Sequence, residues 1–390
     1  MAISEKVVGY MEKSSWIRKM FEEGIQLKKE FGEENVFDLS LGNPVMEPPE
    51  EVLKALVECA RDESPGLHRY MPNAGFADVR AVIAESLSPE CKLSANDVVM
   101  VCGAAGGLNI TLKTLLDPGD EVIIFTPYFV EYLFYADNHG GKAVPVPTGD
   151  DFHLDFSALK NALNEKTKAV IINSPNNPTG VVYSRKELRD LADILKTHSN
   201  RFGKAVHLIS DDPYKKITFD GVEAPNILEF YDNSIYITSH SKDIALPGER
   251  IGFVAVHPRC EDAGPIMAGL IFCNRVLGFV NAPALIQRVV KQVQSVTVDV
   301  EQYRRKRDYL YKELTRIGYD VVKPQGAFYF FPKSPLEDEV EFVRKLAENK
   351  VLVVPGRGFG LPGYFRIAFC FPDSVIEGSI AGFEQAYKAL

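Results

Sequence analysis

Short apolar runs alternate along the chain with longer segments in which apolar residues recur every three or four positions. The runs lie at 98–101, 121–125, 169–173, 206–210, 234–238 and 251–256. Runs of this length predict buried strands, whereas segments such as 50–61, 76–87 and 185–197 have the spacing of amphipathic helices. The alternation predicts an α/β fold with a mainly parallel sheet sandwiched between layers of helices.

The pattern changes near residue 285. There we expect one long helix over 284–317, followed by short apolar strands at 328–331 and 366–369. These elements indicate a smaller α+β domain, completed by the N-terminal segment. We therefore expect a large domain over 46–284 and a small domain formed by 1–45 and 285–390.

Composition narrows the possible partners. The chain has 390 residues, 46% of them hydrophobic, which is enough for more than one compact domain. A net charge of −9 without a basic stripe argues against nucleic acid as a partner. Six scattered cysteines without a Cys-x-x-Cys pair predict free thiols in a reducing compartment and no metal site.

Targeting signals are not evident in the sequence. The first 19 residues have no apolar core, and no run approaches the roughly 20 apolar residues of a membrane helix. We expect a cytoplasmic protein with no membrane partner.

A lysine follows one predicted strand in Ser239-His240-Ser241-Lys242, and Arg250 lies eight residues further along. A partly desolvated lysine amine forms reversible Schiff bases with aldehydes. Ser239 and Arg250 supply a hydroxyl and a permanent cation, which together suit a phosphate. The combination predicts a pocket for pyridoxal 5′-phosphate, although a lysine in an ordinary loop is the alternative.

A second motif, Asn173-Ser174-Pro175-Asn176-Asn177-Pro178-Thr179-Gly180, also follows a predicted strand. Prolines and glycine fix the backbone at the carboxyl edge of the sheet, where α/β proteins bind ligands. An asparagine there can donate to a phenolate oxygen. The alternative is a strand-to-helix turn in which Ser184 caps the next helix.

The third motif is Ser210-Asp211-Asp212-Pro213-Tyr214. A carboxylate at a strand end could keep a pyridine nitrogen protonated, and the ring would then accept electrons from a carbanion. Tyr214 could bond the ring oxygen. Capping of the next segment by either aspartate is the alternative.

Small residues at 103–107 join the strand at 98–101 to a helix expected over 108–116. Backbone amides at such a helix start bind phosphate. A nicotinamide dinucleotide site is the weaker interpretation, because the sequence here is not Gly-x-Gly-x-x-Gly.

The order and spacing of these motifs resemble those of class I/II aminotransferases of fold type I, in the aspartate aminotransferase superfamily. The resemblance extends from about Val36 to the C-terminus and includes Phe365-Arg366-Ile367. It implies a pyridoxal-phosphate-dependent homodimer with shared active sites. Such an enzyme moves the amino group of an L-amino acid, such as aspartate or another dicarboxylic or aromatic donor, to a 2-oxo acid by a ping-pong mechanism.

The resemblance also implies roles around the cofactor ring. Lys242 would bond the aldehyde and later shuttle the proton, and Asp211 would pair with the ring nitrogen. Asn177 and Tyr214 would bond the ring oxygen. Phe129 would stack on the ring, with its neighbour Tyr128 as the fallback and core packing as the alternative for both.

Further roles follow for the phosphate and the substrate. The expected phosphate ligands are Ala104, Ala105, Ser239, Arg250 and, from the partner subunit of a dimer, the residue equivalent to Tyr70. Gly42, Asn177 and Arg366 would bind the substrate carboxylate. Arg275 would cross to the other subunit and bind a distal carboxylate, although a one-residue misalignment leaves a surface arginine equally compatible.

Asn43, Ser174, Asp212 and Pro213 depart from the commonest family pattern, but none of them replaces a group with a chemical role. The same residues could support a C–S β-lyase, a decarboxylase or a synthase. A non-catalytic regulator that senses the cofactor is a remote alternative, because no room for a DNA-binding module precedes the motifs.

Overall fold

A computed structural model describes residues 2–13, 15–87 and 89–390, without the side chains of 12–13, 15–21 and 89. The expected domains include residues 1, 14 and 88, which lie outside the described residues. None of the helices in the described chain is long and apolar enough to cross a membrane.

A seven-stranded sheet is the largest element of the structure, in the order β2-β8-β7-β6-β5-β3-β4. Its strands are β2 (Val98–Val101), β3 (Glu121–Thr126), β4 (Lys142–Pro147), β5 (Thr167–Ile172), β6 (His207–Asp211), β7 (Ser234–Ser239) and β8 (Gly252–Val256). Strands β3 to β7 are parallel, whereas β8 is antiparallel to both of its neighbours. The prediction of a mainly parallel α/β sheet is therefore confirmed.

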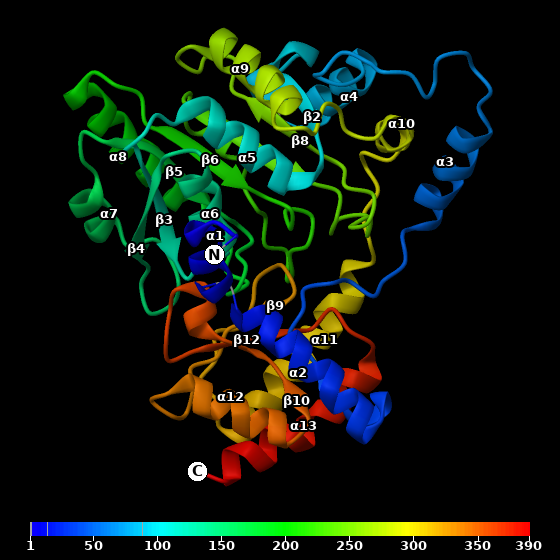
Figure 1. Ribbon diagram of the computed structural model, residues 1–390, viewed down its shortest axis with the longest axis vertical. Helices are drawn as coiled ribbons and strands as arrows, with labels where there is room; N and C mark the ends of the chain where they lie inside the picture. The colour runs from blue at the N-terminus through cyan, green and yellow to red at the C-terminus, as the bar shows by residue number, and fades with distance from the viewer. Residues whose placement is uncertain (1, 14, 88) are drawn as a thin grey trace.

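Helices cover both faces of this sheet (Figure 1). One face packs against α5 (Gly103–Leu115), α6 (Glu131–Asn138) and α9 (Ala263–Val276), and the other against α7 (Phe156–Ala162) and α8 (Arg185–Phe202). Near β2 and β8, α4 (Ala77–Leu87) and α10 (Ala284–Gln292) pack together, and α3 (Glu50–Arg61) lies against α10. We call the sheet and these helices the sheet body.

A second group of elements, the small body, lies below the sheet body in Figure 1. Its helices are α2 (Ser15–Phe31), α11 (Val300–Ile317), α12 (Glu339–Glu348) and α13 (Asp373–Lys388). Its short strands are β1 (Phe37–Asp38), β9 (Tyr329–Phe330), β10 (Val351–Leu352), β11 (Val354–Pro355) and β12 (Phe365–Ala368). An aromatic-rich core fills it, with Phe328, Phe342, Phe365 and Phe383 all fully buried. Buried aromatic rings contribute large apolar areas and so help to stabilise this small unit.

The expected single helix over 284–317 is wrong. The structure has α10 and α11 instead, separated by residues 293–299. The peptide N–H of Val298 and the hydroxyl of Thr297 both donate to the Asp243 carbonyl, and the Asp299 side chain caps α11. β-Branched residues with outside partners and a capping aspartate thus end one helix and begin another.

Two further differences lie in the sheet body. Helix α5 begins at Gly103, five residues before the expected start, because the small residues form its first turns rather than a loop. Strand β4 was not predicted, since Pro145 and Pro147 interrupt its apolar pattern. Prolines are tolerated there because β4 is an edge strand.

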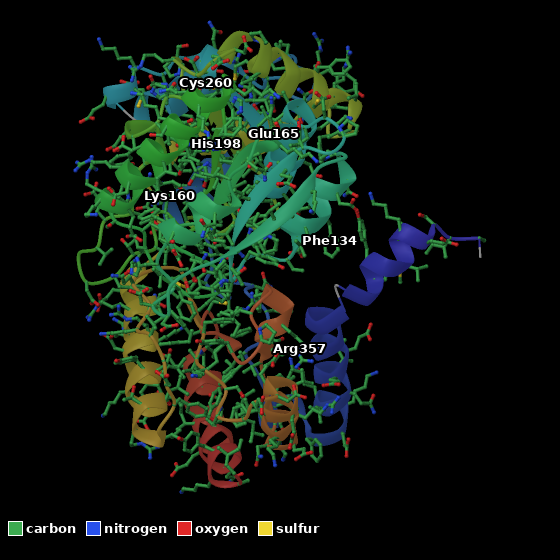
Figure 2. The ribbon with its side chains drawn as sticks, turned by 90° about the vertical axis from the view of Figure 1, so that its left-hand side faces the viewer. Phe134, Lys160, Glu165, His198, Cys260 and Arg357 are labelled. Carbon is green, nitrogen blue, oxygen red and sulfur yellow. The ribbon has the colours of Figure 1, made fainter. Side chains whose placement is uncertain are left out.

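Helix α1 (Glu5–Lys13) joins the two bodies by packing on α6. The Tyr10 and Phe134 rings lie 4.8 Å apart, and the Lys6 ammonium lies 2.9 Å from the Asp137 carboxylate. Figure 2 shows Phe134 on the side of the sheet body that faces the N-terminal helices.

Candidate active site

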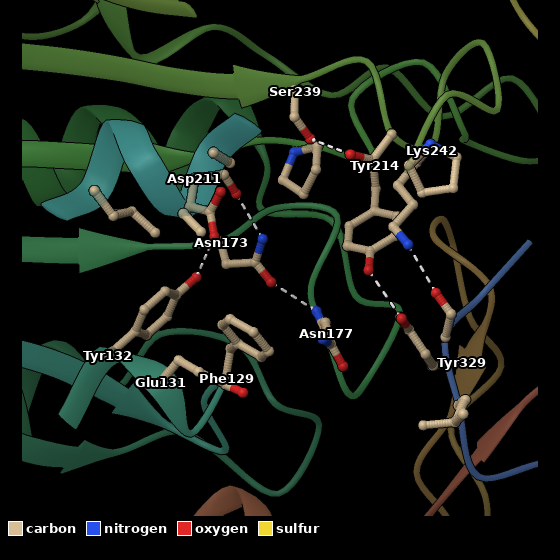
Figure 3. Close-up of a pocket in the computed structure, with 18 of the residues that line it drawn as sticks. Phe129, Glu131, Tyr132, Asn173, Asn177, Asp211, Tyr214, Ser239, Lys242 and Tyr329 are labelled. Carbon is tan, nitrogen blue, oxygen red and sulfur yellow. Dashed lines mark hydrogen bonds between the residues drawn. The ribbon is translucent and has the colours of Figure 1, made fainter. Parts of the chain in front are cut away.

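A cavity of about 340 Å³ lies where the carboxyl ends of the central strands meet the small body (Figure 3). Eleven of the thirteen residues predicted for the site line it: Gly42, Ala104, Ala105, Phe129, Asn177, Asp211, Tyr214, Ser239, Lys242, Arg250 and Arg366. They come from both bodies, so the cavity is complete only when the two are packed together.

Lys242 lies three residues after β7, and its side chain crosses the cavity toward the N-terminal segment. Its Nζ atom donates to the carbonyl oxygen of Gly42 at 2.7 Å. Burial, helped by the positive charges of Arg366 and Arg250, lowers the pKa of Lys242 to about 8. A substantial neutral fraction near pH 7–8 makes this amine a competent nucleophile and base.

Asp211 is the last residue of β6, and its carboxylate faces the cavity. Its Oδ2 atom accepts a hydrogen bond of 2.7 Å from the Tyr132 hydroxyl, while Oδ1 is buried with no partner among the described residues. Burial, with the charge of Asp212 adding to it, raises the pKa of Asp211 to about 7. A cation placed beside Oδ1 would restore an ordinary ionised carboxylate.

The neighbouring Asp212 faces away from this cavity. Its carboxylate accepts from the Ser210 hydroxyl at 2.5 Å and borders a separate pocket that contains Lys215. Burial raises the pKa of Asp212 to about 6, although the Lys215 charge opposes the shift. Successive side chains at a strand end point to opposite sides, so only one of the two aspartates can serve the cavity.

Asn173 connects the carboxylate motif to the asparagine motif. Its amide nitrogen donates to the Asp211 carbonyl at 2.5 Å, and its oxygen accepts from the Asn177 N–H at 2.7 Å. The Asn177 side-chain oxygen in turn accepts from Arg366 at 3.1 Å. These bonds fix the ends of β5 and β6 relative to β12 of the small body.

The Arg366 guanidinium is buried and held on several sides. It donates to the Ser40 carbonyl, and it lies 4.7 Å from the ring centroids of both Tyr329 and Phe359. Its Nε atom has no hydrogen-bond partner in the described part of the chain. A carboxylate with two oxygens is a suitable ligand for such a planar donor.

Two tyrosines and a glycine shape the wall between the bodies. The hydroxyls of Tyr214 and Tyr329 lie 2.9 Å apart. A Cβ atom on Gly42 would lie 1.9 Å from the Tyr329 hydroxyl, so only glycine fits at this position. Burial raises the pKa of Tyr214 far above its ordinary value, which keeps its hydroxyl protonated as a donor.

The opposite end of the cavity is suited to an anion. Ala104 and Ala105 lie in the first turn of α5. Gly103 has a φ of +73°, and a Cβ atom there would lie 2.8 Å from the Arg250 guanidinium. Ser239 ends β7 and its hydroxyl lies 3.2 Å from that of Ser241. Helix-terminal amides, hydroxyls and a guanidinium together match a phosphate.

Phe129 lines the cavity, whereas Tyr128 packs against Gly360 and donates its N–H to the Phe359 carbonyl. The structure thus places Phe129, and not the fallback Tyr128, where a ring could stack.

Tyr70 and Arg275 lie outside the cavity. Tyr70 is 92% exposed, and Arg275 is exposed near the end of α9, with its guanidinium 5.5 Å from the Phe272 ring. Within one chain neither residue reaches Lys242, so their predicted roles depend on a second subunit.

Sequence reasoning did not assign several of the residues that line the cavity, among them Glu131, Tyr132, Asn173 and Tyr329. Tyr132 follows Phe129 by three positions, but Phe129 precedes α6 (Glu131–Asn138), so helical spacing alone does not place the two on one face. Asn173 and Tyr329 lie inside motifs already identified, but nothing local indicates which motif member points inward. In the described chain no group of three or more His, Cys, Asp or Glu residues could hold a metal ion.

The family model for class I and II aminotransferases matches residues 34–380. A probable aspartate aminotransferase of Methanocaldococcus jannaschii is 32% identical over 90% of this chain and 93% of its own length. Aromatic-amino-acid aminotransferase 2 of Thermococcus litoralis is 31% identical, with 100% and 99% covered. The crystal structure of an aminotransferase from Eubacterium rectale superimposes with a TM-score of 0.95 at 39% identity, covering 100% of this chain and 99% of that one.

Proposed function

The chain belongs to the class I and II aminotransferases, and from this membership we propose that it is a pyridoxal-phosphate-dependent enzyme whose cofactor binds in the cavity around Lys242. The observation that carries the proposal is the placement of three groups around one space. Lys242 offers an amine with a lowered pKa, Asp211 an unpartnered carboxylate oxygen, and Arg366 a guanidinium. These suit an aldehyde, a protonated ring nitrogen and a carboxylate, respectively.

The residues present fit the cofactor. The buried Oδ1 of Asp211 lacks a partner among the side chains described, and a ring N–H would supply one. The first turn of α5, Ser239 and Arg250 would hold the phosphate, while Asn177 and Tyr214 would bond the ring oxygen. Phe129 would cover one face of the ring. A buried carboxylate so placed is costly without a cationic ligand, which supports this fit.

Bound there, pyridoxal 5′-phosphate supplies an electron sink that stabilises negative charge at the substrate α-carbon. Arg366 holds the α-carboxylate and so anchors the amino donor in the cavity beside Lys242. The Nζ atom of Lys242 accepts the α-proton of the substrate and donates a proton again in a later step. Asp211 keeps its charge beside the ring. Tyr132 holds the Asp211 carboxylate in position, and Asn173 holds the main-chain carbonyl of the same residue.

Two half-reactions follow from one site. In the first, the enzyme retains the amino group of an L-amino acid and releases the corresponding 2-oxo acid. In the second, another 2-oxo acid binds and accepts that amino group. The amino donor is the open variable: relatives are named for aspartate and for aromatic amino acids, and these are the first donors to test.

We also propose the larger organisation that the family suggests. The cofactor domain spans 46–284, and 1–45 with 285–390 form the small domain, although α10, at the start of the second segment, packs on α3 and α4 of the sheet body. Because Lys242 and Arg366 come from different domains, substrate would draw the two together. The working unit is a homodimer in the cytoplasm, in which Tyr70 reaches the phosphate of the partner.

The experiment is a donor screen on the purified protein with 2-oxoglutarate, oxaloacetate and pyruvate as acceptors. A visible absorbance band that borohydride removes, together with 2-oxo acid formed only when an acceptor is present, is the expected result. Release of pyruvate and ammonia from cysteine conjugates without an acceptor would instead identify a C–S β-lyase. Absence of the band would refute the cofactor assignment.

A further inference from the structure

Glu131 is the one charged residue of the cavity, within the described chain, that the proposed function does not use. The charged groups lining it are Glu131, Asp211, Lys242, Arg250 and Arg366. Under the proposed function Arg250 is neutralised by the phosphate, Asp211 by the ring nitrogen and Arg366 by the substrate α-carboxylate. Lys242 reacts as a neutral amine. The Glu131 carboxylate is left without a counter-charge.

Glu131 lies where its charge can act on a bound substrate. It is the first residue of α6, two positions after Phe129, and it borders the same cavity (Figure 3). Its Oε2 atom is buried and has no hydrogen-bond partner within the described residues. Burial raises the pKa of Glu131, and the charge of Arg366 only partly opposes that shift. An ionised carboxylate in such a place is costly until a ligand pairs with it.

A structural role for Glu131 at the helix start is the simplest alternative. Carboxylates in the first turn of a helix are stabilised by the helix dipole. Glu50 occupies the same first position in α3, but its side chain is 78% exposed and pairs with Lys54 at 2.8 Å. The helix start alone therefore does not require a carboxylate to turn into a cavity.

We propose that Glu131 selects amino donors whose side chain ends in a cation or another hydrogen-bond donor, and that it disfavours dicarboxylic donors. This inference rests on the proposed function, because Arg366 and the cofactor must take the other charges. A cationic side chain would satisfy Oε2, whereas a second carboxylate would meet a like charge within the same cavity.

The test compares donors of matched length and different charge: L-ornithine, L-glutamine, L-norvaline and L-glutamate, with pyruvate as acceptor. In the wild type we expect kcat/KM to be highest for ornithine and at least about tenfold lower for glutamate. Glu131→Gln keeps the shape and removes the charge. It should lower kcat/KM for ornithine by about tenfold or more, raise it for glutamate, and change norvaline by less than about threefold.

Binding without turnover gives an independent measurement. The 2-methyl analogues of ornithine and glutamate lack the α-proton, so spectroscopic titration of the holoenzyme reports their dissociation constants alone. We expect the same order, reversed or flattened in Glu131→Gln. Glu50→Gln is the matched control, since it removes a first-turn glutamate outside the cavity and should leave all donor ratios unchanged.

Several outcomes would overturn the inference. A wild-type preference for glutamate over ornithine would do so, as would failure of the ornithine analogue to bind. An equal change for all donors in Glu131→Gln would show that the residue acts on Arg366 and the common α-carboxylate. Failure of every donor to transaminate, with the analogues still binding in the expected order, would reject the proposed function and leave the role of Glu131 intact.

Discussion

The cavity and the exposed face that carries Tyr70 and Arg275 differ in what holds their side chains. In the cavity, Asp211 and Arg366 are each fixed by hydrogen bonds to buried neighbours. On the exposed face, Tyr70 projects into solvent and the Arg275 side chain is exposed, with its guanidinium 5.5 Å from the Phe272 ring. The cavity residues lie together within a single chain, whereas any role of the exposed rim residues Tyr70 and Arg275 in the reaction would need a second subunit. Substitutions in the two regions should therefore differ in size and kind.

The largest effect is expected from Lys242→Ala. Loss of the amine removes both the bond to the cofactor aldehyde and the base for the α-proton, so kcat should fall by about 10⁴-fold, the upper range for a positioned base. Single-turnover absorbance measurements would show this directly. In the wild type, borohydride reduction and peptide mapping should tag Lys242. A label on another lysine would show that the cofactor is not bonded to Lys242 in this cavity.

Asp211→Asn should lower kcat by on the order of 10²–10³-fold, because the amide cannot keep the ring nitrogen charged. Asp212→Asn is its matched control: the adjacent carboxylate is equally buried but borders the other pocket. That variant should lose about 1–3 kcal/mol of stability through its bond to Ser210, with less than about tenfold change in kcat. Steady-state kinetics and thermal unfolding of both variants measure these effects. A larger loss of kcat in Asp212→Asn than in Asp211→Asn would show that Asp212, and not Asp211, supports the cofactor ring.

Arg366→Lys should act on binding. A lysine keeps the positive charge but not the planar pair of donors, so KM for amino donors should rise by about 10- to 100-fold while kcat changes little. The binding of 2-methyl donors should weaken by the same factor. A fall in kcat at unchanged KM would indicate instead that Arg366 orients the reacting bond.

The contrast between the two regions also explains how much the sequence could predict. The carboxyl ends of parallel strands lie at one edge of a sheet. Once the strands were identified, this rule predicted that the residues following them would lie close together, namely Asn177, Asp211 and Ser239. Tyr132 and Glu131 were missed because their direction depends on how α6 packs. The break between α10 and α11 was missed because it depends on Asp243, about 50 residues away in sequence. Tertiary contacts determine these features, and local pattern does not contain them.

For Tyr70→Phe we expect a smaller change, confined to the cofactor. If the hydroxyl reaches the phosphate of a partner subunit, its loss should raise the half-saturating cofactor concentration by about five- to tenfold with kcat retained. Titration of the apoenzyme followed by absorbance measures this shift. The prediction also requires that the active protein is a dimer, which sedimentation at working concentration measures. An active monomer would exclude any contribution of Tyr70 across subunits.

Arg275→Leu is expected to have the smallest effect. It tests whether donor specificity is determined by the exposed rim residues or by the residues that line the cavity. The family resemblance would place Arg275 near the distal carboxylate of a partner's substrate if the loop is shifted by one residue, and that role predicts a selective loss for aspartate and glutamate. The structure supports a different expectation, because Arg275 is exposed beside Phe272 while Glu131 lines the cavity. We therefore expect kcat/KM to change by less than about threefold for every donor, within the range of a surface substitution. A loss of about tenfold or more for aspartate, with aromatic donors unaffected, would show that the rim of the partner subunit determines specificity.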